Sequence, residues 1–149
     1  MSTWSRALLF CSAIALSFSA SADVSAAPKD DPVVVKVSQA TNDLHSVFMA
    51  VKLATVTARR GHPTTLFVNL EAVRLFVKSQ PAELRWGTME SSLSDMLDAY
   101  AKAGGKILVC PHCAKAAGID AKQLAHGARL ASADQVGDLF SAAGKVIDY

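Results

Sequence analysis

The sequence predicts an α/β fold, a three-layer α/β/α domain built on a mainly parallel five-stranded sheet. Short apolar runs alternate along the chain with segments whose apolar residues recur at helical spacing. Strands that are apolar along their whole length are typical of a parallel sheet covered on both faces. The chain has 149 residues, of which 51% are hydrophobic and 19% charged. This composition suits one domain with a buried core and excludes a disordered chain.

The N-terminus has the layout of a secretory signal peptide. A short polar start carries one positive charge at Arg6, an apolar stretch fills 7–20, and Ala20-Ser21-Ala22 supplies the small residues of a cleavage site. The alternative is a membrane anchor, but a spanning helix needs roughly 20 apolar residues. We therefore expect residues 1–22 to be a cleaved signal peptide, 23–32 a flexible leader and 33–149 the folded domain. The mature protein is then periplasmic or secreted, with no membrane span.

The sequence of the first half of the domain predicts two strands and two helices. A β-branched run at 33–37 is the first strand, and the polar residues 38–43 form a turn after it. Apolar residues at helical spacing follow from Leu44 to Ala58, and Gly61 ends that helix because glycine readily takes a left-handed conformation. The next elements are a strand at 64–69, a short helix at 71–78 and an irregular stretch at 80–91.

The second half continues the alternation with three further strands. A helix with Leu93 and Tyr100 on one face stops at the glycines 104–105. A late helix is opened by Ser132 and Gln135, which have the spacing of a capping box. The remaining expected elements are strands at 106–109, 128–131 and 146–147 and short helices at 114–117 and 120–126.

In a parallel sheet the carboxyl ends of the strands meet at one edge, where ligands bind. This places the segments 38–43, 69–72 and 110–113 along one rim. Only the third, Cys-Pro-His-Cys, carries distinctive chemistry. The chain has 3 Cys, and Cys11 falls in the predicted signal peptide. The mature protein therefore keeps one pair, Cys110 and Cys113.

The pair stands where a strand is followed by a helix. Pro111 suits the first helical position, because its missing N–H would have no partner there. Free N–H groups and the positive dipole end at such a helix start favour the thiolate of Cys110, the nucleophilic form. Cys113 is close enough to resolve a mixed disulfide or persulfide on Cys110. His112 either assists as a cation or proton donor, or is simply an exposed residue at the helix start.

Three interpretations of the pair follow from the residues alone. A structural disulfide across two intervening residues closes a very small loop and stabilises little. A zinc site needs four ligands, and the pair supplies two unless His112 or His126 joins it. A thioredoxin-like oxidoreductase fits the tetrapeptide but not its context, because three strand candidates precede it and no proline follows Pro111. His45, His62 and His126 are expected at surface or cap positions, although His126 is within reach of the pair.

A fourth interpretation comes from resemblance. The strand 107–109 ending in Cys110, followed by a short Ala-rich helix closing on Gly118, resembles the DsrE/DsrF-like family of sulfur-relay and sulfur-oxidation proteins. Cys110 matches the cysteine at the strand end in that family, and Gly118 matches its glycine. Supporting matches are the segments 50–61, 69–75 and 103–105. The likeness spans roughly 33–149 and implies a DsrE-like fold, flavodoxin-like in general architecture.

The resemblance also implies a function. Members of this kind carry sulfur or transfer it, so Cys110 is expected to bind sulfane sulfur as a persulfide. Cys113 is then the resolving or protecting thiol, and His112 is the third site residue. The implied partners are a sulfur-donor or sulfur-acceptor protein, or a small sulfur compound. A homo-oligomer is also implied, with Trp86 as a candidate contact.

Two other functions stay open, so enzymatic activity is undecided at this point. One is a thiol–disulfide oxidoreductase that uses Cys110 and Cys113, and the other is a non-catalytic binding subunit. The formal net charge is only +2 and no basic tract is present, which argues against a nucleic-acid partner. We expect no cofactor and no metal.

Overall fold

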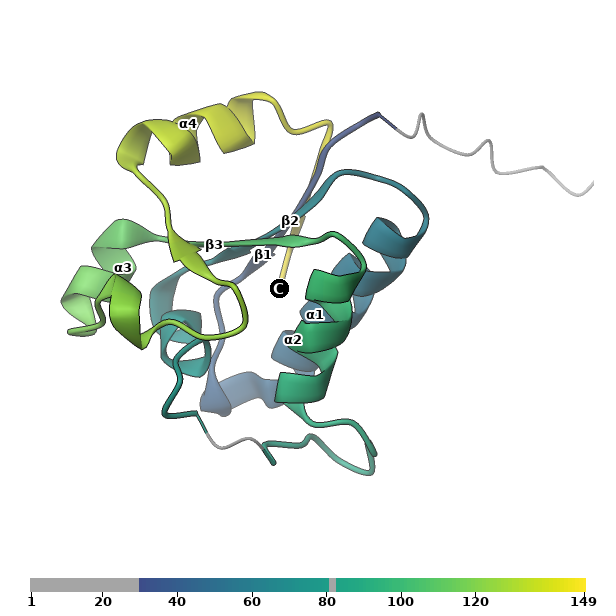
Figure 1. Cartoon of the computed structure of the whole chain (residues 1–149), viewed down its shortest axis with the longest axis vertical. Coiled ribbons are helices and arrows are strands. Elements are labelled where there is room, and N and C mark those ends of the chain that lie inside the picture. Colours follow the sequence, from purple (N-terminus) through teal and green to yellow (C-terminus); the bar gives the residue numbers. More distant parts are fainter. Residues whose placement is uncertain (1–29, 81–82) are drawn as a thin grey trace, which may run out of the picture.

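Five parallel strands form the central sheet of the computed structural model, which describes residues 30–80 and 83–149 (Figure 1). In chain order they are β1 (Val33–Val37), β2 (Thr64–Val68), β3 (Lys106–Val109), β4 (Arg129–Leu130) and β5 (Lys145–Asp148). They lie in the order β4-β3-β2-β1-β5, and every neighbouring pair is parallel. The predicted α/β class with a parallel five-stranded sheet is confirmed, and the strand order is new information.

Helices connect the strands throughout the described part of the chain. The α-helices are α1 (Leu44–Arg59), α2 (Leu93–Lys102), α3 (Pro111–Ala116) and α4 (Ala133–Ser141). Three 3-10 helices accompany them: η1 (Thr41–Asp43), η2 (Leu70–Leu75) and η3 (Ala121–Gln123). The starts of α2 and α4 are fixed by capping boxes, as the spacing of Ser132 and Gln135 predicts for α4.

Two predicted helices are wrong in type or length. The segment 71–78 forms the 3-10 helix η2, and 120–126 keeps only the short turn of η3. The reason is a contact between the two segments. Val77 and Leu124 form an antiparallel bridge, flanked by hydrogen bonds from Lys78 N–H to Gln123 O and from Ala125 N–H to Phe76 O. Backbone groups used in this bridge cannot continue an α-helix.

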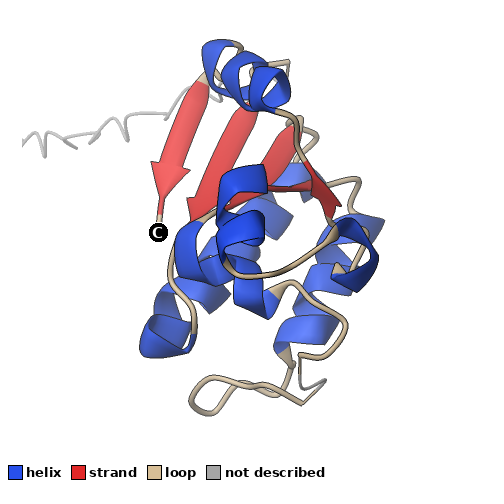
Figure 2. Cartoon of the chain, turned by 90° about the vertical axis from the view of Figure 1, so that its left-hand side faces the viewer, coloured by secondary structure: helices blue, strands red, loops and turns tan. Residues whose placement is uncertain are grey.

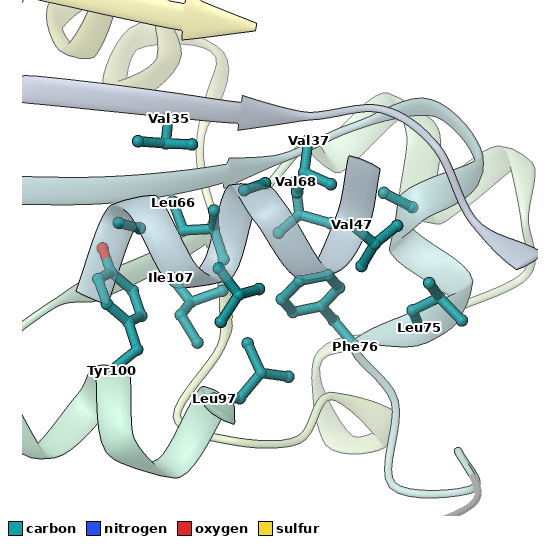
Figure 3. Close-up of a cluster of buried hydrophobic side chains, with 14 of the residues drawn as sticks. Val35, Val37, Val47, Leu66, Val68, Leu75, Phe76, Leu97, Tyr100 and Ile107 are labelled. Carbon is teal, nitrogen blue, oxygen red and sulfur yellow. The ribbon is translucent and has the colours of Figure 1, made fainter. Parts of the chain in front are cut away.

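The larger hydrophobic core lies between one face of the sheet and helices α1 and α2, which lie side by side beneath it (Figures 1 and 2). Alternate strand residues such as Val35, Leu66 and Ile107 point into this core, because side chains of a strand alternate between its faces. Phe76 and Tyr100 fill the space between the strands and the helices (Figure 3).

The opposite face of the sheet is covered by α4 (Figure 2). Val34, Phe67 and Leu108 are buried beneath it, and Phe67 meets Phe140 of α4 edge-to-face at 5.1 Å. No residue of α4 is fully buried. Val146 of the edge strand β5 remains 51% exposed. Helix α4 therefore covers its face of the sheet much less completely than α1 and α2 cover theirs.

The predicted signal peptide at 1–22 lies outside the described residues, as does most of the predicted leader. Within the described residues, none of the helices has the length and apolar character needed to cross a membrane.

Two glycines provide a matched test of this packing. A methyl group on Gly105 would meet the ring of buried Tyr100, whereas one on Gly137, inside α4, would meet nothing within 4 Å. We expect Gly105→Ala to destabilise the protein by about 1–3 kcal/mol, through overpacking. Gly137→Ala should stabilise it by about 0.5–1 kcal/mol, because alanine loses less backbone entropy in a helix. Urea unfolding of both variants measures this, and equal effects would contradict the described packing.

Candidate functional site

The backbone hydrogen bonds of the sheet continue one residue beyond the strand ends at the carboxyl rim. Cys110 N–H donates to Val68 O at 2.8 Å, and Asn69 N–H donates to Val37 O at 3.1 Å. Val37 pairs with Val68, and Val68 with Val109, so Ser38, Asn69 and Cys110 are the next row across the sheet. The three segments predicted to share a rim therefore do so.

Cys110 caps helix α3, as the sequence predicts. Pro111 occupies the first turn, and the carbonyl oxygen of Cys110 accepts from Ala114 N–H at 3.0 Å. The Sγ atom of Cys110 accepts from the N–H of Cys113 at 3.4 Å, in the role that a serine or aspartate oxygen usually fills. The helix start thus presents a backbone donor to this sulfur atom.

The two cysteines are free thiols with different surroundings. Cys113 Sγ donates to Cys110 Sγ at 2.8 Å. Burial raises the pKa of the Cys113 thiol, and its hydrogen bond to Cys110 raises it further. Cys113 therefore holds its proton, while Cys110 accepts both an N–H and an S–H. This asymmetry favours Cys110 as the nucleophile and Cys113 as the donor.

The pair also straddles the two layers of the fold. Cys110 packs against the cluster under α4, which includes Phe67 and Leu108. Cys113 packs against the larger core. It also lines a pocket of about 350 Å³ on that side, together with Leu70, Glu71, Arg74, His112, Ala116 and Ala117. The two thiols thus pack against different clusters, and Cys113 also lines this pocket.

The pocket beside Cys113 has an unusual wall. Leu70 has a φ of 46° and is 60% exposed, although branched apolar residues rarely adopt the left-handed region. Strain of this kind clusters at functional sites. Arg74 adds a positive charge to this wall, and its Nε atom donates a hydrogen bond to Oε2 of Glu71 at 2.8 Å. The sequence holds no signal for the conformation of Leu70, so this wall was not predicted.

The predicted site histidine, His112, is exposed and lines the pocket beside Cys113. In the part of the chain that the structure describes, it makes no hydrogen bond to either sulfur atom. A role of His112 in stabilising a thiolate at Cys110 therefore has no support from a contact, and a role in moving protons at the pocket stays a prediction.

The other histidines have their contacts or positions outside the Cys-Pro-His-Cys motif. His126 contacts Asp98 of α2 at 3.3 Å and lines a separate pocket with Leu75 and Leu97. His45 stacks on the half-buried Trp86 at 4.0 Å between ring centres. His62 precedes β2, at the opposite edge of the sheet. Among residues 30–80 and 83–149, no three His, Cys, Asp or Glu side chains group so as to hold a metal ion. A zinc site at the pair therefore gains no support.

One polar contact at the rim is not predictable from the sequence pattern. Ser38 Oγ donates to Asn69 Oδ1 at 2.8 Å, across the end of the β1–β2 pair. Both residues directly follow apolar strands, which was the available signal. Their contact depends on β1 and β2 being neighbours, and the sequence did not determine the strand order.

The comparisons with known proteins agree with this architecture. A model of the DsrE/DsrF-like family matches residues 32–149. The crystal structure of the ychN protein from E. coli is similar with a TM-score of 0.59 and 19% identity, covering 80% of this chain and 99% of that one. MTH1491 of Methanobacterium thermoautotrophicum, described as a protein of unknown function, is similar with a TM-score of 0.58 and 15% identity, covering 80% and 100%. No curated protein sequence matches the chain.

The asymmetry of the pair predicts an order of alkylation. Iodoacetamide should modify Cys110 before Cys113 in the reduced protein at neutral pH, because the raised pKa of Cys113 keeps it protonated. Reaction at Cys113 should accelerate only when the pH rises above the range in which ordinary cysteines ionise. Timed quenching followed by peptide mass spectrometry measures both rates.

The matched controls are Cys113→Ser and Cys113→Ala. Serine keeps a donor toward Cys110, whereas alanine removes it, so Cys110 should react several-fold more slowly in the alanine variant at pH 7. Faster alkylation of Cys113 than of Cys110 in the unmodified protein would contradict the assigned roles.

Proposed function

Because the chain belongs to the DsrE/DsrF-like family, we propose that it is a sulfur carrier or sulfurtransferase with Cys110 as the sulfur-binding residue. The observation that carries this proposal is the position of Cys110. Its sulfur atom lies at a helix start on the carboxyl rim and accepts hydrogen bonds from Cys113 N–H and Cys113 Sγ. Donors of this kind stabilise negative charge on sulfur.

The proposed first step forms a persulfide. The Cys110 thiolate attacks the outer sulfur atom of a sulfane-sulfur donor such as thiosulfate. A new bond forms between Cys110 Sγ and that sulfur atom. The sulfur–sulfur bond of thiosulfate breaks, and sulfite leaves with the electron pair. Atoms and charge balance, because one thiolate and one dianion give one persulfide anion and one dianion.

The second step delivers the sulfur or releases it. An acceptor thiolate takes the terminal sulfur atom and regenerates the Cys110 thiolate. Alternatively, Cys113 attacks Cys110 Sγ, so that a disulfide forms and HS⁻ leaves. The proton of Cys113 passes to the leaving sulfur atom, so that the persulfide anion releases HS⁻, and His112 at the neighbouring pocket is the proposed carrier of this proton. The starting separation of 2.8 Å between the sulfur atoms suits this closure.

The setting of the protein is part of the same proposal. The layout of residues 1–22 supports export, so the site would work in the periplasm or outside the cell, near inorganic sulfur compounds. Its partner is a sulfur-donor or sulfur-acceptor protein, or a small sulfur compound. We also propose that the protein assembles as a homo-oligomer.

Mass spectrometry of the reduced mature protein tests the persulfide directly. After exposure to thiosulfate or polysulfide, we expect a one-sulfur adduct on the peptide that contains Cys110. Cys113→Ser should accumulate more adduct, because it cannot form the disulfide that releases HS⁻. Cys110→Ser should form none.

The serine variants serve as mutual controls, since each keeps a side chain of similar size at the rim. The carrier role is lost when neither the unmodified protein nor Cys113→Ser gains a sulfur atom on Cys110. An adduct confined to Cys113 would reverse the two assigned roles.

A thiol–disulfide oxidoreductase is the second candidate, favoured by the close approach of the two sulfur atoms. Its signature is an oxidising reduction potential together with rapid disulfide formation in a reduced substrate protein, measured in a glutathione-buffered assay. A non-catalytic binding subunit is the third candidate. It would be supported by a Cys110→Ser strain that keeps the wild-type phenotype.

A further inference from the structure

We propose that the side-chain amide of Asn69 donates a hydrogen bond to the terminal sulfur atom of the Cys110 persulfide, and that Ser38 positions this amide. The inference rests on the proposed function, since it concerns the product of its first step. It assigns a role to two rim residues outside the cysteine motif.

The register of the sheet makes Asn69 the lateral neighbour of Cys110. Val68 pairs with Val109, so the residues that follow them occupy the next row. Neighbouring strands lie about 4.8 Å apart. Asn69 is in extended conformation, with φ −136° and ψ 179°, so the alternation of β2 continues through it. It shares the face of Phe67, which is the α4 face against which Cys110 packs.

The contact with Ser38 fixes which way the amide is turned. Ser38 Oγ donates to Oδ1 of Asn69 at 2.8 Å, and Ser38 follows β1, on the side of β2 away from Cys110. The amide group is planar, so Nδ2 forms its other prong. Within the described residues Nδ2 has no hydrogen-bond partner. The structure therefore contains an oriented N–H donor without a partner, on the residue that lies next to Cys110 across the sheet.

The resting thiolate and the persulfide place their charge at different points. In the resting site, Cys110 Sγ takes its donors from Cys113, and Asn69 makes no hydrogen bond to it among the described contacts. A bound sulfane sulfur extends the side chain by a bond of about 2.05 Å and carries the negative charge at its end. Cys113 donates to the inner sulfur atom, so the outer one needs a donor from a neighbouring strand. The side-chain amide of Asn69, at the end of the neighbouring strand β2, can supply this donor.

The surroundings strengthen such a bond. Cys110 packs against the apolar cluster beneath α4, where a hydrogen bond to a charged sulfur gains strength from the low local polarity. Directly after Asn69, the left-handed turn at Leu70 leads the chain to the pocket that Cys113 lines. Asn69 itself, still in extended conformation, stays on the face of the sheet that Phe67 and Cys110 share.

The test uses Cys113→Ser as the parent, because this variant cannot form the disulfide that would release HS⁻. Asn69→Asp has the same shape and keeps an acceptor for Ser38, but it replaces the donor with an anion. We expect it to form the thiosulfate-derived adduct roughly tenfold more slowly and to lose it faster to added thiol. Ser38→Ala should give a smaller loss, and Ser38→Thr, which keeps the hydroxyl donor, should restore the parent rate. Stopped reactions analysed by mass spectrometry give these rates.

A readout on the thiol alone separates a chemical role from a structural one. Iodoacetamide alkylation of Cys110 at pH 8 in Asn69→Ala should match the parent, because the resting thiolate takes its donors from Cys113. If the parent forms the adduct, and both Asn69→Asp and Asn69→Ala form it as fast as the parent, the proposed role of Asn69 is wrong. The proposed function of Cys110 would not be affected by that result. Equal slowing of alkylation and of adduct formation would overturn it too, as a packing effect. A parent without any adduct would overturn the proposed function and this inference together.

Discussion

The hydrogen bond from Cys110 N–H to Val68 O holds the candidate site to the sheet. It extends the β2–β3 ladder by one step, so the first residue of the Cys-Pro-His-Cys motif is still tied to the strand when the helix begins. The same residue, with φ −57° and ψ 119°, is the N-cap of α3, and its carbonyl oxygen accepts the first hydrogen bond of that helix. One backbone unit therefore serves both elements. The direction of the Cys110 side chain follows from the pleat of β3 rather than from a flexible loop.

This constraint also separates the two thiols. Cys110 follows the alternation of β3 and packs on the α4 face, beside Leu108. Cys113 lies one helical turn later and packs on the larger core, where burial raises its pKa. Two residues with the same chemistry thus acquire different protonation behaviour from their places in the layers. The hydrogen bond from Cys113 to Cys110 raises the pKa of Cys113 further.

The sequence predicted the features of the fold that depend on local patterns. The strand positions followed from apolar runs, the start of α4 from the spacing of Ser132 and Gln135, and the cap at Cys110 from the proline after it. Features that depend on distant contacts were missed. The bridge between Val77 and Leu124 replaced two expected helices, and the neighbourhood of β1 and β2 brought Ser38 to Asn69. A periodic pattern cannot show either contact, because each joins segments that are far apart in the sequence.

The site itself divides in the same way. The cysteine motif was evident because its chemistry lies within four consecutive residues. Leu70 was not, since nothing about a leucine predicts a φ of 46°, and its conformation is maintained by the structure around it. The sequence allowed His126 to lie near the cysteine pair. In the structure it contacts Asp98 and lines a different pocket. The chemistry of the rim is therefore local at Cys110 and Cys113, while the groups that surround this pair are supplied by the order of the strands. For that reason Asn69 can be the lateral neighbour of Cys110 at the rim, although η2, α2 and β3 lie between the two residues in the sequence.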